Sequence, residues 1–387
     1  SHDVDAPVVV AAASYLTGLN QLVSNLQPLI LGALAVGYGF SDAALGQVSA
    51  AFIGFNTLCI ISSPIWVRRA NWRSLALGGS AAGTVCFLLG IWATTLPLIL
   101  LLFALQGLIK GFVGAPAFTC LGDSANPDRT YSIALIVQSG LAALAAVPLS
   151  AWIIPRFGAE GMFIAVAAMI ATGILVSRKI PPAGNLMAYE GGSSNVKIIS
   201  RAAIPPLITL FSTALFIAGA LGFWFFAERI GAARGVPAAL IGATISLSAF
   251  ATIAAAGIVA WLGTRFSSHA YIVAGTAVLL AGLGCLALPG DAPYVASVAI
   301  FSLGYGLAQP GYWSVARKVD ITGRLFAAML AAGGVAGVCI GLLAGTIIAR
   351  GGYNALVLNC AVLAIAGAVL AGASIVIARR SSVVVQA

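Results

Sequence analysis

A single lysine lies in the middle of a long apolar stretch of this 387-residue sequence. Lys110 is the only charged residue of the apolar stretch 97–119. A lysine at the centre of a membrane-crossing helix costs about 2.5–3.5 kcal/mol, so such residues usually face a bundle interior or a water-filled cavity. We interpret Lys110 as a cationic anchor for an anionic group. The alternative is a structural partner for polar groups on a neighbouring helix.

Glu228 is the one acidic residue that the sequence places at membrane depth. It follows the aromatic run Phe223–Phe226 and precedes Arg229. A carboxylate there suits an outer gate pair or a proton-binding site. The alternative is an interfacial charge beside an aromatic belt.

Polar side chains recur at helical spacing in two further apolar segments, so that each set lies mainly on one side of its helix. The two sets are Asn20, Ser24 and Gln27, and Tyr305, Gln309 and Tyr312. A single buried amide is more often a hydrogen-bonding link between helices. Two such stripes in one chain favour the lining of a polar cavity, to which Trp224 would add flat apolar surface.

The elements that must position these residues are membrane-spanning helices. Hydrophobic residues make up 61% of the chain, charged residues only 7%, and the mean hydropathy is +1.06. A soluble domain usually carries about 25% charged residues. The apolar segments are long enough to cross a hydrocarbon core of roughly 30 Å as helices, and they lack the alternation of barrel strands. The composition therefore predicts an all-α membrane protein with twelve segments, over 9–38, 44–66, 74–94, 97–119, 131–153, 160–177, 204–228, 238–262, 270–289, 293–315, 324–348 and 354–378.

The chain repeats itself after about 195 residues, a period too long for a solenoid. Residues 147–158 correspond to 341–352, and Gly39–Gly46 corresponds to Gly235–Gly242. We therefore predict two pseudo-symmetric six-helix bundles, 1–180 and 204–387, joined by a polar cytoplasmic linker, 181–203. Duplicated bundles in membranes usually place a substrate path at their interface.

The formal charge of +9 reflects topology rather than nucleic-acid binding. Most basic residues fall in alternate connections, whereas the other connections hold only Arg156, Arg229, Arg234 and Arg350. The positive-inside rule then predicts cytoplasmic N- and C-termini. The six cysteines form no CxxC pair or Cys/His metal pattern, so we expect no disulfide framework, metal site or cofactor.

Twelve segments in two halves, with a short basic loop after the second, resemble the major facilitator superfamily over essentially the whole chain. That loop, Pro64–Arg73, has Arg68 where the family motif has an acid. The resemblance implies a cytoplasmic latch in which Arg69 or Arg73 pairs with Asp123. It also implies a central cavity lined by segments 1, 4, 7 and 10, on which lie Asn20, Gln27, Gln106, Lys110, Trp224, Tyr305 and Gln309. A glycine-rich antiporter pattern in segment 5 is only partly present, as Gly140 and Val147-Pro148.

We therefore predict a secondary transporter that moves a small organic anion, such as an aromatic or amphiphilic carboxylate, by alternating access. Lys110 would neutralise the anion, and Glu228 is the candidate for coupling to a proton. The alternatives are efflux of drugs or lipophilic compounds, and a non-transporting receptor or scaffold. The chain offers no nucleophile–base set, so an enzyme is not expected. We expect a monomer in the inner or plasma membrane.

Overall fold

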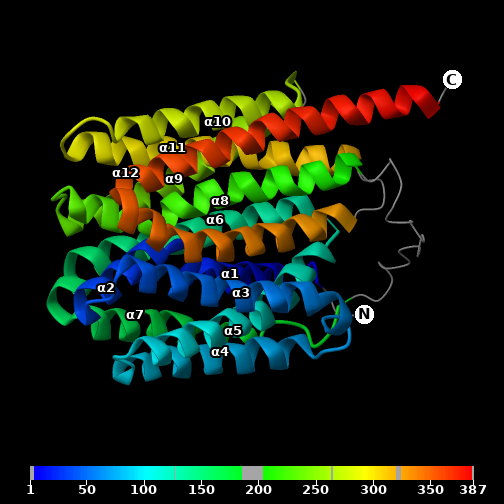
Figure 1. Ribbon diagram of the computed structural model, residues 1–387. Coiled ribbons are helices and arrows are strands. Elements are labelled where there is room, and N and C mark those ends of the chain that lie inside the picture. Colours follow the sequence, from blue (N-terminus) through cyan, green and yellow to red (C-terminus); the bar gives the residue numbers. More distant parts are fainter. Residues whose placement is uncertain (1–3, 126, 185–203, 263–264, 320–323, 386–387) are drawn as a thin grey trace.

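The computed structural model describes residues 4–125, 127–184, 204–262, 265–319 and 324–385, and its regular structure there is entirely helical (Figure 1). The predicted linker lies largely outside the described residues. The helices run roughly parallel or antiparallel in one bundle-like body. They are α1 (Pro7–Asn25), α2 (Gln27–Tyr38), α3 (Asp42–Trp66), α4 (Trp72–Leu89), η1 (Gly90–Trp92), α5 (Leu96–Gly122), α6 (Pro127–Pro148), η2 (Leu149–Ile153), α7 (Ile154–Ser177), α8 (Ile204–Ala233), α9 (Ala238–Leu262), α10 (Ser268–Cys285), α11 (Asp291–Val319) and α12 (Arg324–Val385).

The predicted segments correspond closely to these helices. By length and hydropathy, eight described stretches could cross a membrane, or nine with the bent pair α1 and α2. Two of the eight are 45 and 50 residues long, too long for one crossing. Each of them contains a non-helical glycine, Gly158 or Gly352. Figure 1 shows α12 doubling back on itself, so both stretches hold more than one of the predicted segments.

Turn glycines repeat with the predicted period. Gly39 and Gly235 have φ of 67° and 79°, and Gly158 and Gly352 have φ of 60° and 67°. Only glycine adopts such φ values readily, which fixes these residue types at the turns. All four turns lie at one end of the molecule, which we call the distal end. The end where α1 begins and α12 ends is the terminal end (Figure 1).

The first segment is broken into two helices at Leu26, where α1 and α2 meet at 44°. Pro28 follows the break, and a proline has no N–H to donate to the carbonyl four residues earlier. That carbonyl belongs to Ser24, which is therefore available to a partner from another helix.

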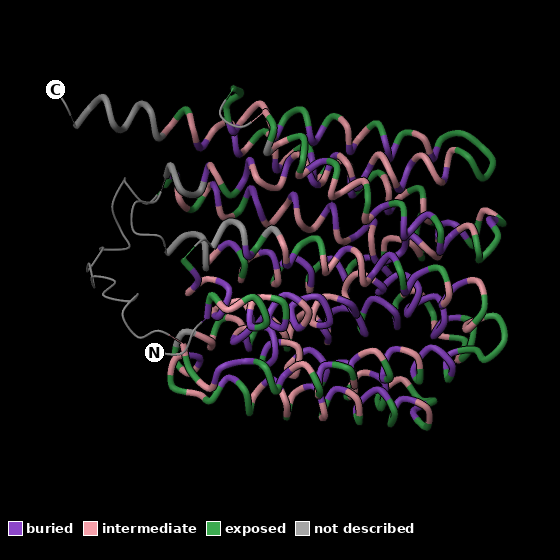
Figure 2. The backbone as a smooth tube through the Cα atoms, turned by 180° about the vertical axis from the view of Figure 1, so that it is seen from behind, coloured by how far each residue is buried: buried purple, intermediate pink, exposed green. Residues whose placement is uncertain are grey.

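Buried residues lie along the whole length of the helices, on the sides where the helices pack against one another (Figure 2). Helices α1, α3, α4, α5, α6 and α7 pack on one another, as do α8 to α12. Large apolar side chains such as Val36, Leu144 and Trp261 are 79%, 77% and 73% exposed. Exposed apolar side chains on long helices suit contact with lipid.

Small residues bring the two helix groups together at their distal halves. Gly46 of α3 lies so close to Gly341 of α12 that a Cβ on it would overlap the Gly341 backbone oxygen. At the equivalent place in the other pair, Gly242 of α9 packs on Ser150. Ser246 of α9 also donates a hydrogen bond of 2.8 Å to the backbone oxygen of Ala143 in α6. Backbones approach this closely only where side chains are small.

Candidate functional site

The ammonium group of Lys110 points to neighbouring helices rather than away from them. Its Nζ donates a 2.6 Å hydrogen bond to Oγ of Ser24 on α1. It also lies 5.3 Å from the ring centroid of Phe52 on α3, within range of a cation–π contact. Lys110 is half-buried, and no carboxylate of the described part of the chain forms an ion pair with it. The cation has polar and aromatic neighbours, but no counter-charge among them.

Ser24 also contacts the second helix group. Trp224 of α8 donates a 3.2 Å hydrogen bond from its indole Nε1 to the backbone oxygen of Ser24. This is the carbonyl that Pro28 cannot use. Ser24 thus contacts Lys110 through its side chain and Trp224 through its backbone. The break between α1 and α2 brings predicted site residues from α5 and α8 to one point.

Three of the four predicted amides lie apart from that point, each in a different place. Asn20 packs on Gly114, one turn beyond Lys110, and its Oδ1 is buried without a described hydrogen-bond partner. Gln106 is buried against Gly83 of α4, so its amide faces another part of the bundle than Lys110. Gln27 is buried on α2. Of the three, Asn20 is the one that shares the α1–α5 interface with Lys110.

The polar stripe of α11 forms its own cluster. Gln309 donates a 2.7 Å hydrogen bond to the hydroxyl of Tyr305. The rings of Tyr305 and Tyr312 stack on Phe216 of α8, with centroids 5.9 and 4.7 Å apart. Phe216 lies two turns before Trp224 on the same helix. Stacked rings tie α8 to α11, and the amide of Gln309 is held by a residue of its own helix.

Glu228 lies one turn beyond Trp224 and is packed against Gly32 of α2. Its Oε2 is buried and has no described hydrogen-bond partner. The ion pair of this region is made by its neighbour Arg229, whose Nε lies 3.4 Å from Oδ1 of Asp42. A buried carboxylate oxygen without a partner is costly, which singles out Glu228 from the acids that lie at helix ends.

Asp42 and Tyr353 are the distal residues that the sequence did not single out. The Tyr353 hydroxyl lies 3.1 and 3.0 Å from the two carboxylate oxygens of Asp42. Together with Arg229, these contacts join α3 to α8 and α12 at the distal end. Asp42 is the first residue of α3, just after the Gly39 turn. An acid at this position is common at helix starts, so the sequence alone indicates a helix start here and not a contact with Arg229 and Tyr353. Among the described residues, no three histidine, cysteine or acidic side chains are arranged to hold a metal ion.

The predicted latch has a different basic partner. Arg68, rather than Arg69 or Arg73, forms a two-pronged pair with Asp123, at 2.5 and 2.7 Å. The hydrogen bonds that Arg68 donates to the Asp123 carboxylate raise the pKa of Arg68 above its ordinary value. Arg73 instead donates to the backbone oxygen of Ile180 at 2.9 Å, and Arg69 is exposed. Arg68, which stands where the family motif has an acid, is therefore the basic partner of Asp123.

We expect Arg68→Ala to lower the melting temperature of the purified protein by several degrees. The Asp123 side chain is only 3% exposed, so the variant leaves a buried carboxylate without its charged partner. Arg69→Ala is the matched control, because it removes an exposed arginine from the same loop. Equal melting temperatures for the two variants would contradict a structural role for the Arg68–Asp123 pair.

The sequence matches the family model described as Major Facilitator Superfamily over residues 13–320. That range covers most of the chain. The chain belongs to the Major Facilitator Superfamily. Among curated protein sequences, none matches it significantly.

Solved structures of this superfamily share the fold at low sequence identity. A structure of the nucleoside transporter NupG has a TM-score of 0.69 and 14% identity, covering 95% of this chain and 98% of its own. A proton-dependent oligopeptide transporter structure has a TM-score of 0.73 and 16% identity, with 96% and 98% covered. A bacterial homologue of the human lysosomal transporter Spinster, inward-facing and unoccupied, has a TM-score of 0.66 and 16% identity, with 98% of each chain covered.

Family membership settles the class of the protein. It is a multi-pass, all-α membrane protein and a transporter for small molecules, and it is not an enzyme. These statements confirm the predicted fold and transport function at the level of the superfamily. At identities of 14–16%, these structures establish the fold, and the substrate has to be argued from the residues of this chain.

Proposed function

We propose that this transporter moves a small organic anion, with Lys110 as the group that binds its negative charge. The observation that carries the proposal is an ammonium group held by Ser24 and Phe52 with no ion pair to a described carboxylate. A hydroxyl and an aromatic ring stabilise a cation but do not neutralise it. An anionic substrate would supply the missing counter-charge, and an ammonium has two further donors to offer it.

The aromatic residues nearby favour a substrate with a flat apolar part. Trp224 contacts the same serine as Lys110, and Tyr305 and Phe216 stack within the same helix group. Aromatic rings recognise one another by offset or edge contacts. An aromatic carboxylate combines the charge that suits Lys110 with the surface that suits Trp224.

We further propose that the contact of Asp42 with Arg229 and Tyr353 closes the distal side in one state and opens in the other. In this view, the two predicted bundles rock about Ser24, Lys110 and Trp224. The distribution of arginines supports cytoplasmic N- and C-termini and a distal end that faces outward. A monomer in the inner or plasma membrane is part of the same proposal.

We expect Glu228→Gln to abolish proton-driven accumulation of the anion while substrate exchange continues. Glutamine keeps the size of the side chain but cannot exchange a proton, and Glu228 is the carboxylate with a buried, unpaired oxygen. The measurement is uptake into proteoliposomes with and without a pH gradient. Glu160→Gln is the control, because Glu160 is exposed at the distal end. Accumulation by Glu228→Gln at the wild-type level would refute a coupling role.

The substrate class can be tested on purified protein by thermal shift. Aromatic carboxylates are compared with their amides, which have nearly the same shape and no charge. A ligand of the folded state raises its apparent stability by mass action. We expect stabilisation by at least one carboxylate and none by its amide. Stabilisation only by neutral or cationic lipophilic compounds would favour drug efflux instead.

A further inference from the structure

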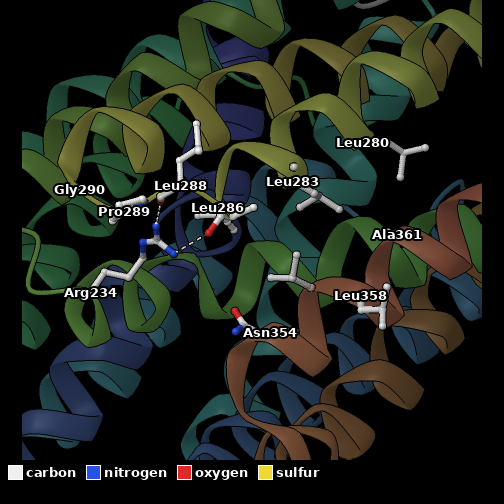
Figure 3. A pocket seen from close by; sticks show the side chains of 13 residues that line it. Arg234, Leu280, Leu283, Leu286, Leu288, Pro289, Gly290, Asn354, Leu358 and Ala361 are labelled. Atoms are coloured by element: carbon white, nitrogen blue, oxygen red, sulfur yellow. Dashed lines mark hydrogen bonds between the residues drawn. The ribbon is translucent and has the colours of Figure 1, made fainter.

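A second feature with the marks of a binding site lies at the distal end of α8, α10 and α12, apart from Lys110. It is a cavity of about 740 Å³ (Figure 3). A smaller cavity of about 230 Å³ continues from it towards the Gly352 turn and shares its charged residue, Arg234. We call the two together the Arg234 groove. Its other lining residues are mainly apolar and include Leu280, Leu283, Leu358 and Ala361.

Arg234 is fixed at the head of this groove by the end of α10. Its guanidinium donates hydrogen bonds to the backbone oxygens of Leu286, at 2.9 Å, and Leu288 (Figure 3). Its Nε is buried and has no described hydrogen-bond partner. Within the described residues, no carboxylate forms an ion pair with Arg234. The charge is therefore positioned but not neutralised.

The walls of the groove are open and apolar. Leu288 and Leu358 are 60% and 65% exposed. The second half of α12 packs on α8 through Gly219 and Cys360, and α10 packs on α11 and α12. From Asn354 to Ala361, α12 rises about 10 Å along its axis, a large part of one leaflet's roughly 15 Å of hydrocarbon.

We propose that the Arg234 groove binds an anionic phospholipid of the surrounding membrane. The phosphate would lie against Arg234, beside the exposed Asn354, and one acyl chain would run between Leu283 and Leu358. Each terminal nitrogen of the guanidinium has a second N–H besides the one given to Leu286 or Leu288, and a phosphate oxygen is a strong, charge-assisted acceptor for it. Because the groove has both a charged head and an apolar wall that covers a large part of one leaflet, a lipid fits it better than a free phosphate does. This inference is independent of the substrate of the transporter.

Native mass spectrometry of the detergent-purified protein tests the proposal with two lipids of identical chains, phosphatidylglycerol and phosphatidylcholine. We expect the wild type to retain several-fold more phosphatidylglycerol, and Arg234→Gln to lose that preference. Leu358→Trp should fill the groove and reduce retention of both lipids. It leaves the Arg234 bonds to α10 intact, so it stays informative if Arg234→Gln does not fold.

Two controls match these variants. Arg350→Gln removes an exposed arginine at the same end, outside the groove, and Leu343→Trp enlarges an exposed leucine, 55% accessible, elsewhere on α12. Both should retain lipid as the wild type does. The proposal is overturned if Arg234→Gln keeps the preference, or if Arg350→Gln loses it equally. It is also overturned if inorganic phosphate alone displaces the phosphatidylglycerol, since a free anion would then be the ligand.

Discussion

Lys110→Ala should lower the efficiency of anion transport by roughly 100-fold while the protein still inserts and folds. A hydrogen bond to a charged group contributes up to about 3 kcal/mol, and every 1.4 kcal/mol is a tenfold change in efficiency. Lys110 touches Ser24 and Phe52 but no described carboxylate, so its loss leaves no buried acid unpaired. The measurement is initial uptake of the anion by proteoliposomes, normalised to the amount of inserted protein.

Two further variants make the Lys110 result specific. Lys110→Arg should keep partial transport, because the charge remains while the donor geometry changes. Lys179→Ala removes an exposed lysine just after α7 and should transport as the wild type does. Normal transport by Lys110→Ala would mean that the lysine is only a structural tether, and the neutral-substrate alternative would replace the anion proposal.

Gly46→Val should block transport by keeping the distal end from closing. A Cβ at this position overlaps the backbone oxygen of Gly341, and a backbone atom cannot move aside as a side chain can. Overpacking costs about 1–3 kcal/mol, which shifts a two-state equilibrium by roughly 5- to 150-fold. The population would then move towards the state in which α3 and α12 are apart.

The separation can be read from spin labels at the exposed positions Val36 and Ala232, placed in a background without the six native cysteines. Gly46→Val should lengthen the mean distance between the labels and abolish uptake. Gly78→Val is the control, because a Cβ on Gly78 meets open space. An unchanged label distance in Gly46→Val would contradict a gating role for the Gly46–Gly341 contact.

Hydropathy and repetition predicted the elements of this fold well. The apolar segments 44–66 and 238–262 correspond to α3 and α9 within a few residues, because a membrane span must satisfy its backbone hydrogen bonds internally. The glycine turns recur in the second half because the same turn geometry is needed twice. The length of an apolar span and the glycine at a turn depend only on nearby residues, so both can be predicted from a single sequence.

Contacts between helices were harder to predict, since they depend on how each helix is rotated. Gln106 lies one turn from Lys110 on α5, yet it packs on α4 whereas Lys110 contacts α1. Residues on one side of a helix can therefore meet two different neighbouring helices. Arg68 rather than Arg69 meets Asp123, because the chain leaves α3 in a turn whose direction decides which arginine faces α5. The pattern of charges alone does not fix that direction.

The most informative contact missed by sequence analysis is that between Ser24 and Trp224. Pro28 lies four residues after Ser24. Its physical effect is to release the carbonyl of Ser24, to which α8 then donates. A proline four residues after a polar residue in a membrane helix is a signal that could have indicated this contact.

Binding of an aromatic carboxylate and its amide to wild type and Lys110→Ala tests the central claim most directly. The four affinities form a double-mutant cycle, which isolates the interaction between the ligand's charge and the lysine from shape and general stability. We predict that the wild type prefers the carboxylate by about 2 kcal/mol or more, the range of a charge-assisted hydrogen bond, and that Lys110→Ala has no preference. An undiminished preference for the carboxylate in Lys110→Ala would contradict the proposal that Lys110 binds the substrate's negative charge.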